Sequence, residues 1–247
     1  MSTLEGKVAI VTGASRGIGR GIARALAAEG AALVLHATQR EHLEPCLGQL
    51  KEKYGGRYFS MDGDIARPNT SEQLVQAALN TFGHLDIVVG CAGINRDGMV
   101  HKLSDEAWER VLAVNLSGVF YLTRAAARTM RQQRSGRIIH ISSIARHGNL
   151  GQANYAASKA GVAALTQTAA LELGPLGITC NAICPGFIDT DMTQTVPNNA
   201  RERMISRIPV RRIGTPEDIG AVVAFLASDQ ASYINGQILD VSGGLIL

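Results

Sequence analysis

The sequence predicts a three-layer α/β fold, a doubly wound parallel sheet covered by helices on both faces. Short apolar runs alternate along the chain with longer stretches of helical periodicity, which is typical of parallel strands joined by right-handed crossovers. A hydrophobic content of 46% and 27 glycines among 247 residues suit buried strands and tight turns. No linker interrupts residues 1–247, so a single domain is expected.

Seven short runs are predicted to be strands. Their apolar character is continuous, as expected of strands that are buried on both faces. They are Lys7–Thr12, Ala32–Ala37, Tyr58–Met61, Leu85–Gly90, Arg137–Ile141, Ile178–Ile183 and Ile238–Val241.

The stretches between these runs carry helical patterns. The first includes Ile22, Ala23, Leu26 and Ala27, and the others lie near Glu41–Lys53, Thr70–Phe82, Asp105–Met130, Tyr155–Leu173 and Pro216–Ala227. The last has the clearest start, because Thr215 can cap it and Pro216 occupies its first position. Residues 190–214 break the alternation. They are polar and too long for an ordinary connection, which indicates a substrate lid.

Charge and composition exclude several classes of function. The net charge of +3 is small and the arginines are scattered, so we expect no nucleic-acid partner, although a mildly basic surface could favour an acidic one. No apolar run reaches membrane-spanning length, and the first predicted strand begins at Lys7, which leaves no room for a signal peptide. We therefore expect a cytoplasmic protein with no membrane contact.

The cysteines and histidines do not have the spacing of metal ligands. The four cysteines lack a Cys-x-x-Cys pair, and the six histidines form no His-x-x-x-His pair. We expect reduced, structural thiols and no metal site.

The first strand ends in a glycine turn, Gly13-Ala14-Ser15-Arg16-Gly17-Ile18-Gly19, which leads directly into a helical pattern. Strand, glycine turn and helix form the context of a Rossmann-type dinucleotide site, where a pyrophosphate sits on the helix N-terminus. The spacing is Gly-x-x-x-Gly-x-Gly rather than Gly-x-Gly-x-x-Gly. The alternative is that the glycines only let the helix pack on the strand.

Tyr155 and Lys159 are four residues apart, which places a phenol and an ammonium on one helix face. A nearby cation should lower the pKa of the phenol toward neutrality and make it a useful proton donor. Such a pair is common on helix surfaces, so its meaning depends on Asn115, on Ser142-Ser143 at a strand end, and on the glycine turn. All of these should lie at one edge of the sheet.

With these motifs in order, the chain resembles the short-chain dehydrogenase/reductase family, and within it the 3-oxoacyl-[acyl-carrier-protein] reductases. The resemblance runs almost end to end. Its motifs are Thr12–Gly19, Ala92–Asp97, Asn115-Leu116, Gly151–Lys159, Pro185–Met192, Ala224–Asp229 and Gly243-Gly244.

The resemblance implies a role for each residue of the constellation. Tyr155 would protonate the carbonyl oxygen, Lys159 would hold the nicotinamide ribose, a serine would hydrogen-bond the substrate oxygen, and Asn115 would anchor a water in the proton path. Counting thirteen places back from Tyr155 gives Ser142, whereas counting along the strand from Gly136 gives Ser143. A one-residue slip reverses side-chain direction, so we favour Ser143 and keep Ser142 as the alternative.

NADPH is the expected cofactor. The second strand ends in His36-Ala37-Thr38-Gln39, without the acid that would bind a ribose hydroxyl, and Arg16 in the glycine turn faces this region and could bind a 2′-phosphate. Together the turn and the family motifs give the predicted cofactor contacts Gly13, Ser15, Arg16, Gly17, Ile18, Gly19, Thr38, Asp64, Ile65, Ala92, Gly93, Tyr155, Lys159, Pro185, Gly186, Ile188 and Thr190.

Two departures from the family pattern affect these expectations. Gly90-Cys91 stand where the family has Asn-Asn, so amides that tie this strand to its neighbours are missing. Arg134 matches one basic position of the docking patch for an acidic acyl-carrier protein, but Leu176 replaces the other. The resemblance therefore implies reduction of a 3-oxoacyl thioester, as in fatty acid synthesis, with carrier protein or CoA as the thioester carrier.

Two other functions remain open on the same scaffold. One is a dehydrogenase of another ketone or secondary alcohol, and the other is a silent NADP-binding protein, against which the intact constellation argues. The resemblance also implies a homotetramer with two kinds of interface. One is formed by the helices at Asp105–Met130 and Tyr155–Leu173, and the other by the last strand and the tail. The small residues of the catalytic helix and the apolar tail Leu245–Leu247 agree with this. Alternatively, the alanines pack on their own sheet and the tail folds back.

Overall fold

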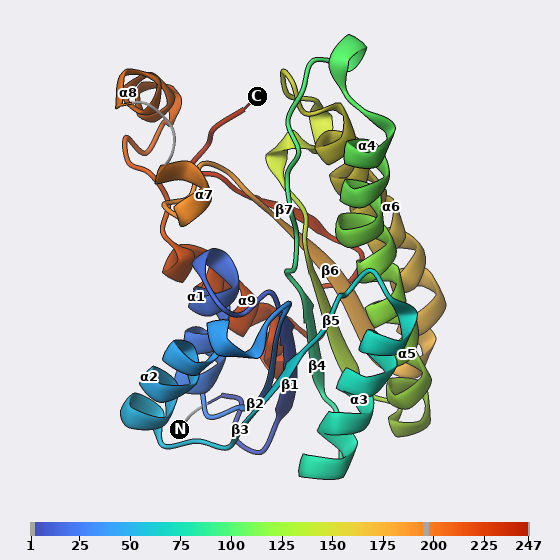
Figure 1. Cartoon of the computed structure of the whole chain (residues 1–247). Coiled ribbons are helices and arrows are strands. Elements are labelled where there is room, and N and C mark those ends of the chain that lie inside the picture. Colours follow the sequence, from blue (N-terminus) through green and yellow to red (C-terminus); the bar gives the residue numbers. More distant parts are fainter. Residues whose placement is uncertain (1–2, 195–197, 247) are drawn as a thin grey trace.

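The computed structural model describes residues 3–194 and 198–246. Within these residues, seven strands form one parallel sheet in the order β3-β2-β1-β4-β5-β6-β7 (Figure 1). The strands are β1 (Val8–Thr12), β2 (Ala32–Ala37), β3 (Tyr58–Asp62), β4 (Ile87–Gly90), β5 (Gly136–Ile141), β6 (Ile178–Pro185) and β7 (Ile238–Val241). The predicted doubly wound fold is confirmed, and the strand order reverses between β1 and β4, where ligands bind in such sheets.

Helices cover both faces of the sheet (Figure 1). On one face lie α1 (Gly17–Ala28), α2 (Glu44–Tyr54) and α9 (Pro216–Ala227). On the other lie α3 (Pro68–Phe82), α4 (Asp105–Leu112), α5 (Gly118–Gln133) and α6 (Ala153–Leu173). The segment between β6 and α9 carries α7 (Asp191–Gln194) and α8 (Asn198–Arg207), which lie in the upper part of the view in Figure 1.

The core consists of two apolar layers, one on each face of the sheet. Successive residues of β1 point in opposite directions, so Ala9 and Val11 join the layer under α1 and α9, whereas Val8 and Ile10 join the layer under α3 and α5. All five residues of β1 are buried, as continuous apolar runs predict. No helix in the described ranges is long and apolar enough to cross a bilayer.

The structure corrects two expectations about helices. The predicted helix Asp105–Met130 is divided into α4, a π-helical turn η3 (Ala113–Ser117), and α5, with the amide of Gly118 bonded to the carbonyl of Ala113. A π turn inserts one residue without interrupting the apolar stripe for long, so periodicity does not reveal it. Residues 190–214 are also more than a polar loop, because they contain α7 and α8.

Helix α9 begins as predicted. Thr215 accepts a hydrogen bond from the Asp218 amide at 3.2 Å, and the Asp218 carboxylate accepts one from the Thr215 amide at 2.8 Å, which completes a capping box. Arg212 donates to both oxygens of Asp218, at 2.6 and 2.9 Å. This guanidinium holds the pKa of Asp218 well below its ordinary range.

Helices α1 and α9 pack against each other through glycine. A Cβ atom on Gly220 would lie 2.8 Å from the Gly21 carbonyl oxygen, and one on Gly21 would lie 2.5 Å from Cβ of Pro216. The two backbones are therefore too close for any side chain at these positions. Pro216 is the first residue of α9, so the contact fixes the start of α9 against α1.

We predict opposite stability effects for the same substitution at two helical glycines. Gly220→Ala should lower the free energy of unfolding by about 1–3 kcal/mol, because its methyl group meets backbone atoms of α1. Gly48→Ala in α2 should raise it by about 0.5–1 kcal/mol, because nothing lies within 4 Å of the added Cβ and alanine favours a helix. Urea unfolding of both variants measures the difference. Equal effects at the two sites would contradict the close approach of α1 and α9.

Candidate active site

The proton-donating pair lies where α6 passes the carboxyl end of β5. Lys159 is buried, and its ammonium donates to the carbonyl oxygen of Ile141, the last residue of β5, at 2.8 Å. The same nitrogen lies 5.6 Å from the centre of the Tyr155 ring. The predicted juxtaposition of phenol and ammonium is therefore present in the structure.

Burial controls the protonation of both groups. It raises the pKa of Tyr155 to about 12, with a hydrogen bond from Ser143 acting in the opposite direction, and it lowers the pKa of Lys159 to about 8. The net shift of the tyrosine pKa is therefore opposite to the expected lowering, because the cost of removing the phenolate from water is the largest contribution. Tyr155 is therefore protonated at neutral pH, as a proton donor must be.

The two neighbouring serines have different partners. Ser142 is buried and donates to the backbone carbonyl of Lys159 at 2.8 Å. Ser143 accepts from the amide of Ala145 at 3.1 Å, and its side chain also acts to lower the pKa of the Tyr155 phenol. Successive residues at a strand end point to opposite sides, so the structure brings Ser143 to the phenol and engages Ser142 with the helix backbone.

Asn115 joins the π turn to the loop that follows β4. Its side-chain oxygen accepts from the Ile94 amide, and its nitrogen donates to the Ile94 carbonyl, both at 2.8 Å. The nitrogen also lies 3.3 Å from the hydroxyl oxygen of Ser158 in α6. A Cβ atom on Gly93 would lie 3.6 Å from Nζ of Lys159, so this loop passes close to the ammonium. Asn115 and Lys159 thus both lie against one short stretch of backbone.

The glycine turn combines a conformational role with a packing role. Gly13 and Gly17 have φ values of 69° and 51°, which other residues rarely adopt. A Cβ atom on Gly19 would collide with the Gly13 carbonyl, so the packing interpretation holds for Gly19. Arg16 at the N-cap of α1 makes no side-chain capping bond. The free amides of this helix start can bind a phosphate, so the turn fits a dinucleotide.

Arg16 is placed near the segment between β6 and α9. Its guanidinium is 75% exposed and lies 4.0 Å from the Asp191 carboxylate, which is 58% exposed. An ion pair this exposed is weak, so the guanidinium can exchange its partner for another anion. Thr38, just beyond β2, is exposed as well.

Two further sets of predicted cofactor contacts lie after β3 and at the end of β6. Asp64 is already engaged, because Arg110 donates to one carboxylate oxygen at 2.9 Å and the Ala66 amide to the other at 3.0 Å, whereas Ile65 is buried in the core. Burial alone would raise the pKa of Asp64, but these bonds hold it below the ordinary value. The positions that lie at or beyond the end of β6 are Pro185, Gly186, Ile188 and Thr190.

Thr12 is a site residue that sequence reasoning missed. Its hydroxyl oxygen accepts from the amides of Cys91 and Ala92, at 3.0 and 3.2 Å, and lies 3.3 Å from the carbonyl oxygen of Val89. This hydroxyl ties the ends of β1 and β4 together, where Gly90-Cys91 lack amide side chains. The available signal was a polar residue at the end of an otherwise apolar strand.

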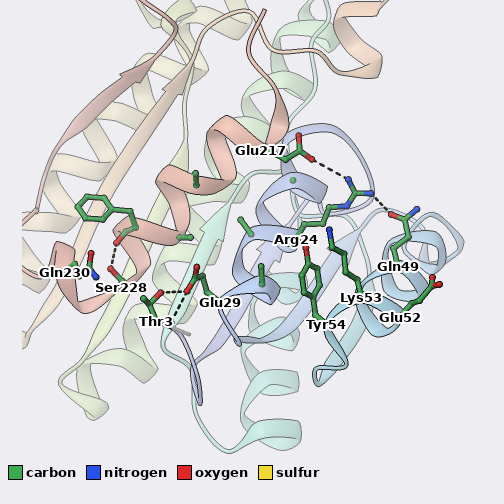
Figure 2. A pocket seen from close by; sticks show the side chains of 16 residues that line it. Thr3, Arg24, Glu29, Gln49, Glu52, Lys53, Tyr54, Glu217, Ser228 and Gln230 are labelled. Atoms are coloured by element: carbon green, nitrogen blue, oxygen red, sulfur yellow. Dashed lines mark hydrogen bonds and ion pairs between the residues drawn. The ribbon is translucent and has the colours of Figure 1, made fainter. Parts of the chain in front are cut away.

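A groove lies apart from these residues. It has a volume of about 960 Å³ and is formed by α1, α2 and α9 (Figure 2). Two of its basic side chains have local partners: Arg24 reaches Glu217 at 3.5 Å and Gln49 at 2.6 Å, and Lys53 lies over the ring of Tyr54. None of the predicted site residues lines this groove. The described residues also contain no cluster of three or more His, Cys, Asp or Glu that could hold a metal.

Several known proteins are similar to this chain. A family model described as Enoyl-(Acyl carrier protein) reductase matches residues 13–246. The chain is 44% identical over 243 residues to the 3-oxoacyl-[acyl-carrier-protein] reductase of Staphylococcus aureus, with 98% of each chain covered. It is 40% identical over 245 residues to that of Thermotoga maritima, with 99% of each covered. The crystal structure of levodione reductase superposes with a TM-score of 0.94 at 34% identity, over 98% of both chains.

Proposed function

The chain belongs to the short-chain dehydrogenase/reductase family, and we propose that it reduces the keto group of a 3-oxoacyl thioester to a hydroxyl with NADPH. The family makes it an oxidoreductase that uses a nicotinamide dinucleotide. One observation carries the proposal: a protonated phenol, Tyr155, lies beside Ser143 and Lys159 at the sheet edge that also holds the glycine turn.

The residues of the site have complementary roles in this reaction. A bound nicotinamide cofactor supplies the hydride. Tyr155 donates its proton to the carbonyl oxygen of the substrate, and the Ser143 hydroxyl donates a hydrogen bond to the same oxygen. Lys159 holds the ribose, and Asn115 fixes the loop beside it through Ile94. The water that Asn115 is expected to anchor in the proton path remains a prediction.

NADPH rather than NADH is proposed from charge. The end of β2 offers no acid for a ribose hydroxyl, and Arg16 is an exposed cation with only a weak partner. Each charge-assisted bond to a 2′-phosphate contributes about 1.5–3 kcal/mol. The remaining predicted contacts stay part of the proposed cofactor site.

A carrier protein or CoA is proposed to bear the substrate, as the names of the relatives suggest. Arg134 ends α5 in a left-handed conformation with an exposed side chain, and a Cβ atom on Gly177 would lie 2.8 Å from its carbonyl oxygen. The backbone just after the half-buried Leu176 therefore lies against Arg134, and Arg134 supplies one cation for an acidic carrier. Residues 190–214 are the proposed substrate lid.

The likeness to levodione reductase favours a second candidate, reduction of another ketone or oxidation of a secondary alcohol. Steady-state rates with NADPH on four substrates separate the possibilities: a 3-oxoacyl carrier protein, acetoacetyl-CoA, an enoyl thioester and an unrelated cyclic ketone. We expect the highest kcat/KM with a 3-oxoacyl thioester. A preference for the cyclic ketone would favour the second candidate, and a preference for the enoyl thioester would follow the description of the family model.

We propose that the protein is a homotetramer that works in the cytoplasm. The outer face of α6 exposes Leu171 at 80%, and the neighbouring α5 exposes Phe120 at 42%. The two described residues of the tail differ in burial. Leu245 is buried beside Ile208 and Cys184 of its own chain, as expected of a tail that folds back, whereas Ile246 is 83% exposed. Leu247 lies outside the described residues. The proposed interface therefore depends mainly on the helices.

The first activity prediction concerns the proton donor. Tyr155→Phe should keep NADPH affinity but lose nearly all turnover, because the ring still packs and the transferable proton is gone. NADPH titration by fluorescence and single-turnover reduction measure the two properties. Turnover within about tenfold of wild type, roughly 1.4 kcal/mol of barrier, would falsify the role of Tyr155 as the acid.

The second prediction concerns cofactor choice. Arg16→Ala should raise the KM for NADPH about tenfold or more and leave the KM for NADH nearly unchanged, because only the 2′-phosphate can bind this guanidinium. Equal losses with the two cofactors would mean that Arg16 supports the loop instead. Arg20→Ala, one turn further along α1, is the matched control.

The third prediction separates the serines. Ser143→Ala should reduce kcat by at least about tenfold with little change in stability, because it removes the hydrogen bond at the phenol. Ser142→Ala should act mainly on stability, by about 1 kcal/mol, because it removes a buried bond to the Lys159 carbonyl. A larger fall in kcat for Ser142→Ala would reverse the assignment.

A further inference from the structure

A buried imidazole lies directly beneath the proposed active site. His140 is the fifth residue of β5 and is 1% exposed. Its Nε2 lies 2.9 Å from the hydroxyl oxygen of Thr123 in α5, and its Nδ1 lies 2.8 Å from the hydroxyl oxygen of Thr166 in α6. The ring therefore bridges two helices from the strand between them.

Counting protons shows that both contacts are hydrogen bonds of a neutral ring. Burial, followed by the charge of Lys159, lowers the pKa of His140 to about 4, so at neutral pH the ring has one N–H donor and one acceptor nitrogen. One threonine accepts from the N–H while its own proton bonds the helix carbonyl four residues earlier, and the other threonine donates to the bare nitrogen. Whichever threonine donates, the ring makes one hydrogen bond to α5 and one to α6.

The bridge reaches the elements that carry the proposed catalytic groups. The chain continues from His140 to Ile141, the last residue of β5, whose carbonyl accepts from Lys159, and reaches Ser143 two residues later. Helix α6 bears Tyr155 and Lys159, and α5 follows directly from the π turn that holds Asn115. A shift of either helix against β5 would change distances within the site.

The space for the ring comes from the neighbouring strand. Gly90 of β4 pairs with His140 in the sheet register. A Cβ atom on Gly90 would lie 3.4 Å from Cδ2 of the imidazole and 3.6 Å from a methyl group of Val119 in α5. A single methyl group fits at contact distance, whereas branches beyond it would overlap the ring or Val119. Gly90 and His140 are thus sterically coupled.

We propose that His140 is a positioning residue whose imidazole, in the space left open by Gly90, holds α5 and α6 against β5 and so fixes the geometry of the active site. The proposal deepens the proposed function and rests on it for the activity measurements below. The imidazole itself touches none of the groups assigned to the reaction.

Two substitutions at His140 separate positioning from packing. His140→Leu fills similar space without polar atoms, and each threonine can still bond its own helix, so the variant should fold. We expect kcat to fall about tenfold or more at an unchanged Kd for NADPH, and His140→Gln, which keeps one donor and one acceptor, to recover much of kcat. A leucine variant within about twofold of wild-type kcat, or no recovery by glutamine, would overturn the proposal.

The coupling to Gly90 provides a matched pair. Gly90→Val should displace the ring and reproduce the kcat loss of His140→Leu, whereas Gly90→Ala should retain wild-type kcat. In a His140→Ala background, Gly90→Val should cause a smaller loss than in the wild-type background, because the overlap with the ring is gone and only that with Val119 remains. If the factors by which the two single substitutions lower kcat simply multiply in the double variant, the coupling between Gly90 and His140 is contradicted. If the leucine variant does not fold, Thr123→Val and Thr166→Val remove the threonine partners of the imidazole instead. We expect the kcat loss of the double variant to be smaller than the product of the two single losses.

A structural measurement decides the matter independently of activity. Crystal structures of His140→Leu and Gly90→Val should show a displacement of the contact from Lys159 to Ile141 or of Ser143 relative to the Tyr155 phenol. Both contacts unchanged in both variants would overturn the proposal. If the wild-type protein reduced no ketone with NADPH, the proposed function would fail, and this comparison would still test the bridge.

Discussion

Every feature of the site depends on the common direction of the seven strands. In a parallel sheet all carboxyl ends emerge at one edge, so residues that are distant in the chain meet there without any specific attraction between them. The ends of β1, β4 and β5 bring Thr12, Cys91 and Ser143 to this edge, and α6 returns over it with its first turns. Short hydrogen bonds such as those of Thr12 then fix what the topology has brought together.

Desolvation is the second physical influence on the site. It opposes charge on both members of the pair, so it keeps the Tyr155 phenol protonated and makes the Lys159 ammonium easier to discharge. The carbonyl of Ile141 compensates the buried ammonium through a dipole rather than a carboxylate. A carboxylate in that place would have neutralised the cation beside the phenol. The strand end thus supplies polarity without adding a competing charge.

Much of this was predictable from the sequence, and the failures have physical causes. The strands and most helices follow from apolar patterns, and the capping box at Thr215 follows from residue types alone. The π turn at Asn115 does not, because inserting one residue leaves the apolar stripe nearly intact. The raised pKa of Tyr155 depends on how much water surrounds the ring, and spacing on a helix carries no information about that. The bridge of His140 depends on the absence of a side chain at Gly90, which lies on the preceding strand, β4.

The close packing of α1 has a consequence for the segment between β6 and α9. Its first residues abut the glycine turn, since a Cβ atom on Gly17 would lie 3.2 Å from Thr190, and its last residues join α9 at Pro216, which rests on Gly21. The Asp189 amide also donates to the Gly214 carbonyl, and the Gly214 amide donates to the Phe187 carbonyl, so backbone hydrogen bonds close the segment at its base. Both ends are thus anchored to the same helix. The segment is anchored at both ends, so it cannot swing as a rigid body about a single hinge. Any opening must come from a conformational change within the segment itself.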